Sequence, residues 1–196
     1  GDEEEAEHPG QRELKTKIMK GLKEHFDQLP EQAQNNISAF ISRGADDNTQ
    51  SLGEGERRAV IESYQEAYGE LPETNEEMAR ALMIANGRFP GKESKKSEEW
   101  AKNKFIEIYD RIPNMENSKD KAAIMTMAYG LRQQAQNRNV QSEEKGLKIF
   151  KNIFGHLPKS TQEWNVMQAI TYSGASAKKD SDKDLLPDSR EKEVGT

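Results

Sequence analysis

Four short stretches, each ending in proline, recur along the chain and constrain its fold more than any other feature. An aromatic residue lies four positions before each proline, and a second bulky residue lies four positions before that aromatic. Helical spacing places two such residues on one face of a helix, and proline disfavours helical geometry in the residue before it. Each stretch therefore predicts a helix with a core-facing aromatic, ended by its proline: FDQLP (26–30), YGELP (68–72), YDRIP (109–113) and FGHLP (154–158).

A second helix is predicted after each proline. Its end is marked by a glycine, which adopts a left-handed backbone at little cost, and these glycines are Gly44, Gly87, Gly130 and Gly174. Its start is clearest in the last unit, where Ser160 or Thr161 suits the N-cap position. Ser97 and Ser142, each followed by two glutamates, are predicted to be N-caps as well.

The repeat predicts an all-α fold of about eight helices in four αα-hairpins. A unit of roughly 40 residues suits both a short solenoid and a compact bundle, and the spacing favours the bundle only slightly. We expect a disordered acidic lead-in at residues 1–12, a helical repeat domain at 13–174, and a linker with a further acidic segment at 175–196. Two polar stretches inside the domain, 46–56 and 132–144, are predicted to be linkers or fraying helix ends.

Composition narrows the possible partners. The chain carries 29 basic and 35 acidic residues without a basic stripe, which argues against binding nucleic acid. No apolar run approaches the length of a membrane span. With no cysteine, the chain has neither disulfides nor thiolate chemistry.

No catalytic motif is found, so we expect a non-enzymatic protein with no catalytic residues and no organic cofactor. His8, His25 and His156 lack a spacing suited to shared metal binding, and His156 lies at a turn position whose residue type varies between units. The glycines of GEGE (53–56) follow no strand, which argues against a phosphate-binding loop.

Three segments of the helical domain are distinctive: IANGRFPGK (84–92), residues 127–158 and WNVMQAITYSGA (164–175). Through them, most of residues 50–175 resembles a helical repeat of uncharacterised bacterial proteins. The resemblance implies a secreted or cell-surface bacterial protein and brings no activity or ligand. The last segment, DSDKDLLPDSREKEVGT (180–196), is similar to the thrombospondin type 3 repeat, which implies calcium binding in an extracellular protein. Residues 175–196 are therefore expected to be a linker and a truncated calcium-binding repeat.

The acids of this last segment also fit the register of a calcium loop. Ligands in a twelve-residue loop come from positions 1, 3, 5, 7, 9 and 12. Counted from the first aspartate, these positions hold Asp180, Asp182, Asp184, Leu186 through its carbonyl, Asp188 and Glu191. Leu185 replaces the usual glycine at position 6, so we expect weak binding of Ca²⁺, roughly 10⁻⁴ to 10⁻³ M.

The sequence predicts a scaffold, interaction or spacer module of a bacterial secreted or cell-surface protein, with a calcium loop that stiffens the joint to the next segment. Its partner would be a protein or a cell-envelope component. The alternative is an intracellular adaptor that binds a partner peptide and carries a disordered acidic tail. A signal peptide in the precursor would distinguish the first from the second.

Overall fold

The computed structural model describes residues 23–177, which are all-α, as the repeat predicts. Residues 23–26 form one helical turn, and the chain then continues through eight further α-helices and one 3₁₀ turn within the described part. These elements are α2 (Glu31–Arg43), α3 (Asp47–Ser51), α4 (Glu54–Tyr68), α5 (Asn75–Ala85), α6 (Lys95–Tyr109), α7 (Ser118–Tyr129), η1 (Ala135–Asn137), α8 (Val140–Phe154) and α9 (Thr161–Tyr172).

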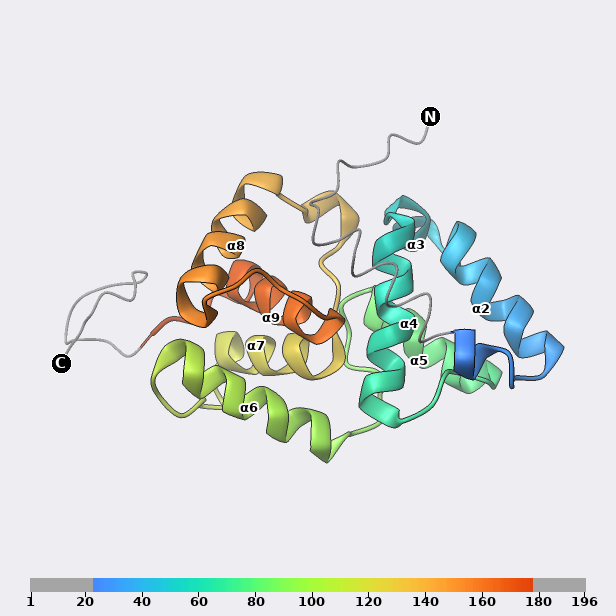
Figure 1. The fold of residues 1–196 in the computed structure, drawn as a ribbon, viewed down its shortest axis with the longest axis horizontal. Coiled ribbons are helices and arrows are strands. Elements are labelled where there is room, and N and C mark those ends of the chain that lie inside the picture. Colours follow the sequence, from blue (N-terminus) through green and yellow to red (C-terminus); the bar gives the residue numbers. More distant parts are fainter. Residues whose placement is uncertain (1–22, 178–196) are drawn as a thin grey trace.

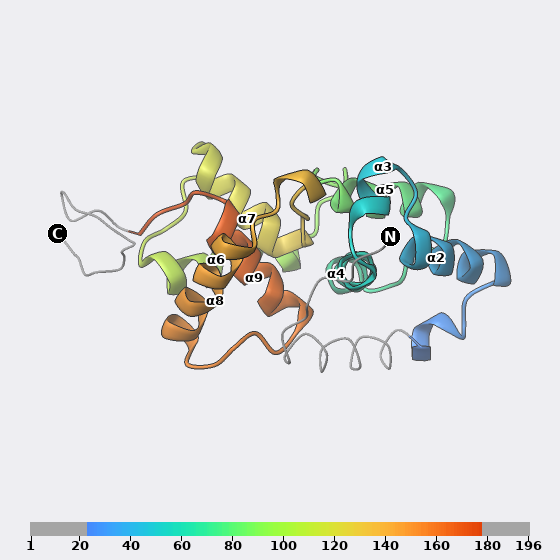
Figure 2. The same ribbon diagram turned by 90° about the horizontal axis from the view of Figure 1, so that it is seen from above.

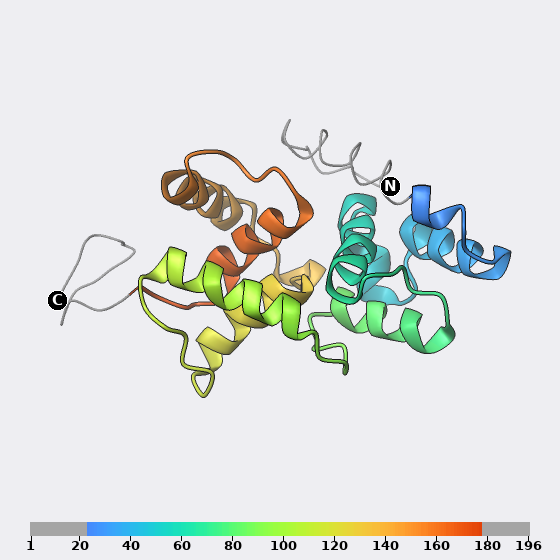
Figure 3. The same ribbon diagram turned by 60° about the horizontal axis from the view of Figure 1, so that its bottom comes forward.

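The described helices fall into two groups that lie side by side (Figures 1 and 2). We call α2 to α5 the N-terminal half and α6 to α9 the C-terminal half. Figure 3 shows α6 running along the outside of the C-terminal half, while α4 stands at the inner edge of the N-terminal half. A single hydrophobic cluster extends through both halves.

The predicted hairpins are present, and the two aromatic residues of each unit pack against each other in a similar way in α4, α6 and α8. The paired rings are 4.7 Å apart in Tyr64–Tyr68, 4.6 Å in Phe105–Tyr109 and 4.6 Å in Phe150–Phe154, measured between centroids. In each pair the first ring is almost fully buried. The i, i+4 spacing therefore marks the core face of α4, α6 and α8.

The hairpins pack as a compact bundle and not as an open solenoid. In a solenoid each repeat touches only its neighbours. Here α4, from the second unit, contacts α6 and α7 of the third unit and also α9 of the fourth. The long-range packing of α4 brings the second and fourth units together and closes the fold.

The helices end earlier than the prolines predict. Helices α4, α6 and α8 each finish at their aromatic residue, and the next residue takes a left-handed backbone: Gly69, Asp110 and Gly155. The N–H of each left-handed residue still bonds the last turn, so the helix is already closed before the proline is reached. The proline lies in the connection that follows, and its predicted role as the helix end is wrong.

The N-caps confirm one prediction and correct another. Ser160 is the N-cap of α9 and its side chain accepts a bond from the Glu163 N–H. Ser97 and Ser142 are not N-caps, because each lies inside the first turn of its helix. The N-caps are Ser94, whose side chain accepts the Ser97 N–H, and Asn139, whose side chain accepts the Ser142 N–H. Asparagine and serine are both strong N-caps, so the pattern of a serine before two glutamates pointed three residues too far along.

Candidate functional site

The six residues predicted to bind calcium lie outside the described residues: Asp180, Asp182, Asp184, Leu186, Asp188 and Glu191. The predicted lead-in at 1–12 also lies outside them, as does His8. Within residues 23–177 no group of three or more His, Cys, Asp or Glu side chains could hold a metal ion. His25 is exposed, and His156 packs edge-on against the Phe150 ring while its Nδ1 is 2.8 Å from the Leu157 carbonyl oxygen.

The two stretches predicted to be linkers or fraying helix ends are ordered, and they contact each other through α3 and η1. Residues 46–56 form α3 and the start of α4, and residues 132–144 contain η1 and the start of α8. The Asn48 side chain bonds the Asn86 carboxamide at 2.9 Å and accepts the Ala135 N–H at 2.9 Å. Hydrogen bonds from polar side chains hold these segments in place. Their polar composition therefore resembles that of a linker, although the segments form an ordered contact between the N-terminal and C-terminal halves.

Next to this contact lies a cluster of buried and partly buried polar side chains that we call the interface network. It comprises Glu56 and Ser63 of α4, Arg132 and Arg138 of the α7–α8 connection, Glu143 of α8 and Asn165 of α9. The network joins the two halves, because Glu56 and Ser63 lie in the N-terminal half and its four remaining members lie in the C-terminal half.

Arg132 is the centre of the interface network. It is 4% exposed, and all three of its nitrogens donate hydrogen bonds. Its Nε bonds the Gly130 carbonyl at 2.9 Å, its Nη1 bonds Glu56 at 3.1 Å, and its Nη2 bonds the Asn165 side chain. Asn165 in turn donates to the Ser63 hydroxyl at 3.0 Å.

Arg138 continues the network on the other side of Glu56. One guanidinium nitrogen lies 3.3 Å from Glu56, and another lies 2.6 Å from Glu143. Burial alone would raise the pKa of Glu56, but the positive charges of Arg132 and Arg138 outweigh it and hold that pKa below its usual value. The carboxylate is therefore ionised, and its Oε1 atom contacts both arginines.

Gly130 makes the close approach of the halves possible. It has φ of +74°, and a Cβ built on it would lie 2.3 Å from the Ser63 hydroxyl and 2.9 Å from the Asn165 amide nitrogen. The glycine that ends α7 thus serves two purposes, since it closes the helix and leaves room for the interface network.

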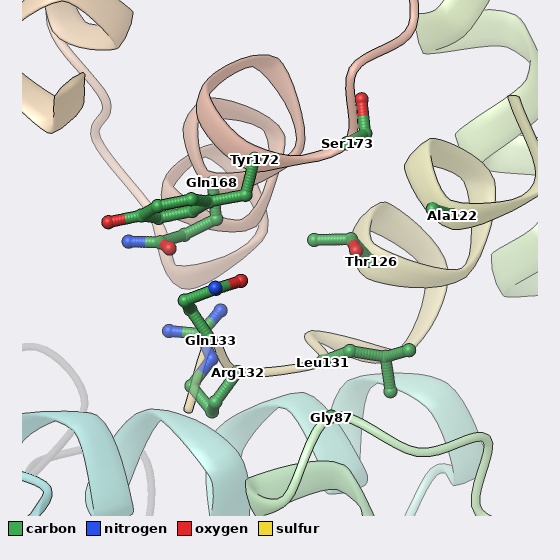
Figure 4. A pocket seen from close by; sticks show the side chains of 9 residues that line it. All are labelled: Gly87, Ala122, Thr126, Leu131, Arg132, Gln133, Gln168, Tyr172 and Ser173. Atoms are coloured by element: carbon green, nitrogen blue, oxygen red, sulfur yellow. The ribbon is translucent and has the colours of Figure 1, made fainter. Parts of the chain in front are cut away.

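A small cleft opens beside Arg132, between the end of α5, the helix α7, the segment after α7 and the last turn of α9 (Figure 4). It encloses about 200 Å³, which is less than the roughly 300–1,000 Å³ of pockets that bury a whole small molecule. The Arg132 and Gln133 side chains form one side, with the Gln168 carboxamide above them and Thr126 facing from α7.

Gln168 is the unusual member of this cleft. It is only 4% exposed, yet its carboxamide forms no hydrogen bond with any described residue. The side chains of Gln133 and Thr126 likewise have no hydrogen-bond partner in the part of the chain that the structure covers. The carboxamide atoms of Gln168 are still reached by solvent through the cleft, so the cleft presents donors and acceptors that no described residue uses.

Tyr172 closes one side of the cleft and belongs to the same polar region. Its hydroxyl donates to Glu143 and accepts the Asn139 N–H at 2.9 Å. Burial and the bond to Glu143 raise the pKa of Tyr172 to about 12, so its hydroxyl stays protonated at neutral pH. It therefore orders the cleft and offers no proton for acid–base chemistry near neutrality.

Sequence reasoning missed both the interface network and the cleft. Their members come from five helices or their ends and from the α7–α8 connection, and the residues that pair with one another are mostly far apart along the chain. The burial of Arg132 is visible only in the structure, because its position just after the glycine that ends α7 does not distinguish it in the sequence from an exposed arginine.

Three comparisons with known proteins found no match. No family model, curated protein or solved structure matches the chain. The two resemblances stated from the sequence therefore stay predictions. In residues 23–177 no helix is long and apolar enough to cross a membrane.

Proposed function

We propose that the chain is a non-enzymatic interaction and spacer module of a bacterial secreted or cell-surface protein. Its helical body supplies a rigid scaffold, and its C-terminal segment supplies a calcium loop that stiffens the joint to whatever follows. The binding partner is a protein or a component of the cell envelope.

One observation supports the scaffold role: the charged side chains of the interface network form ion pairs that connect the two halves. Glu56 is neutralised by Arg132 and Arg138, and Glu143 is shared between Arg138 and Tyr172. Buried and partly buried charges that pair with one another in this way favour one arrangement of helices, and a spacer needs a fixed length.

Rigidity can be measured directly, because the natural chain has no cysteine and accepts two spin labels without background. We choose Asn35 of α2 and Lys148 of α8, which are exposed and lie in different halves. Pulsed electron spin resonance of the double cysteine variant is expected to give one narrow distance distribution. A broad or two-peaked distribution would show that the halves move and would remove the spacer role.

The calcium joint is tested separately by backbone NMR. Millimolar Ca²⁺ is expected to shift the amides of residues 180–191, and Asp182→Ala should abolish the shifts by removing one ligand. Sodium chloride at equal ionic strength is the control. If both salts shift these amides equally, the segment is an ordinary acidic linker and this part of the proposal fails.

The alternative of an adaptor that binds a partner peptide is favoured by a different observation, the unpartnered amides of the cleft. An adaptor and a surface module can share this binding function. They differ in cellular location, which the precursor's signal peptide decides.

A further inference from the structure

We propose that the cleft beside Arg132 is a recognition site for a carboxamide, the side chain of an asparagine or glutamine presented by a partner protein. The inference rests on the interaction role proposed above and names the chemistry of the partner. It is carried by Gln168, a side chain that is 4% exposed and makes no hydrogen bond with a described residue while pointing into the cleft.

The donors and acceptors of the cleft select an amide. Gln168 and Gln133 each present a carbonyl oxygen and an NH₂ group, and Thr126 adds a hydroxyl. The natural complement is a group that carries an acceptor and a donor on the same carbon atom, which is another carboxamide. Hydrocarbon would leave every one of these groups unsatisfied.

The charges around the cleft argue against an ionic ligand. Arg132 already donates to Gly130, Glu56 and Asn165, and Glu56 cancels its charge. An anion would have to compete with Glu56, and a cation would meet the guanidinium. A neutral polar group enters without disturbing the interface network.

The size of the cleft indicates that the ligand enters as one side chain of a larger partner. About 200 Å³ holds a single residue but not a whole drug-sized molecule. A protein loop or extended segment that inserts one glutamine or asparagine would pair the buried amides, while the rest of the segment lies on the surface outside.

The test uses a fragment as the probe and the full chain as the protein. N-acetyl-L-glutamine methylamide is titrated into ¹⁵N-labelled protein, and the side-chain NH₂ signals of Gln168 and Gln133 are followed. We expect saturable shifts with a Kd on the order of 1–10 mM, as suits a fragment of about a dozen non-hydrogen atoms. N-acetyl-L-norleucine methylamide, which has the same length but no amide at its end, should shift these signals at least tenfold more weakly.

Two variants separate recognition from folding. Gln168→Met keeps the length of the side chain and removes its amide, so it should weaken probe binding at least tenfold. Because Gln168 makes no hydrogen bond in the described fold, the same variant should unfold at an unchanged or higher urea concentration. Gln141→Met, on the exposed surface of α8, is the matched control and should leave binding unchanged.

Three results would overturn the inference: equal shifts with both probes, no shift at Gln168, or unchanged binding by Gln168→Met. A large loss of stability in Gln168→Met would also count against it, since it would show that the amide serves the fold. This outcome is distinct from failure of the spacer role. If the chain is rigid but does not bind the probe, only the proposed recognition site is refuted. If the chain binds the probe but its halves move, only the spacer role is refuted.

Discussion

Glu62 shows how one side chain on the central helix α4 can make stability depend on pH. Its Oε2 atom is buried and has no hydrogen-bond partner among the described residues. Burial, helped by the negative charge of Glu66 one turn later, raises the pKa of Glu62 from 4.5 to about 7. Because the folded state binds this proton more tightly than the unfolded state, the contribution of Glu62 to stability is present below pH 4.5 and is lost as the pH rises towards 7.

The first prediction is that Glu62→Gln stabilises the protein at pH 8 and has almost no effect at pH 4.5. The pKa shift corresponds to about 3 kcal/mol, and since the residue is only partly buried we expect about 2 kcal/mol. Urea unfolding at the two pH values measures the difference. Glu144→Gln, at an exposed position on α8 away from Glu62, is the control and should change the stability by no more than about 0.5 kcal/mol. A gain from Glu62→Gln that is the same at both pH values would contradict the burial argument.

At the scale of single elements, the two aromatics of a helix differ in what they contribute. Sequence spacing places Phe150 and Phe154 equally on the core face of α8. In the structure Phe150 is 1% exposed, whereas Phe154 lies at the edge of the core with the Lys104 ammonium 5.2 Å from its ring centroid. The second aromatic residue, Phe154, thus covers the end of the hairpin and buries less of its surface in the core than Phe150 does.

The second prediction follows from this difference. Phe150→Ala is expected to cost about 3–5 kcal/mol of unfolding free energy, as the truncation of a buried aromatic does. Phe154→Ala should cost about 1–2 kcal/mol because only part of its surface leaves water. Guanidinium unfolding of both variants decides it, with the exposed Lys151→Ala as a control within about 0.5 kcal/mol. Equal losses at Phe150 and Phe154 would mean that the core reaches the end of the helix.

The same elements show what sequence can and cannot predict. Aromatic spacing within one helix and a glycine just past its end are local signals, and they located the hairpins and the helix ends at Gly44 and Gly130. The N-cap of α6 was misplaced by three residues, since Ser94 and Ser97 satisfy the same local preference. Arg132 and Glu56 meet only because the halves pack together, and no local pattern in the polar stretches 46–56 and 132–144 encodes that contact.

For the whole molecule, the question is what keeps the two halves in one arrangement. Apolar packing around α4 is non-directional and would tolerate small shifts between the halves. The interface network would not, because Arg132 bonds a backbone carbonyl, a carboxylate and a carboxamide at once. Its energetic contribution should therefore lie in the coupling between residues and not in any one of them.

The last prediction is a double-mutant cycle at Glu56 and Arg132, measured by urea unfolding at pH 7. Glu56→Leu leaves Arg132 charged and buried, and Arg132→Met leaves the Asn165 and Gly130 oxygens without their donor, so each should cost about 3–5 kcal/mol. The double variant removes both charges together and should cost about 1–3 kcal/mol less than the sum. Because the pKa of Glu56 is lowered in the folded state, the contribution of the pair is present above pH 4.5 and is lost as the pH falls towards the folded-state pKa. The coupling should accordingly shrink when the cycle is repeated below pH 4.5. Strictly additive costs at pH 7, or a coupling that does not respond to acid, would show that the halves are held by apolar packing alone.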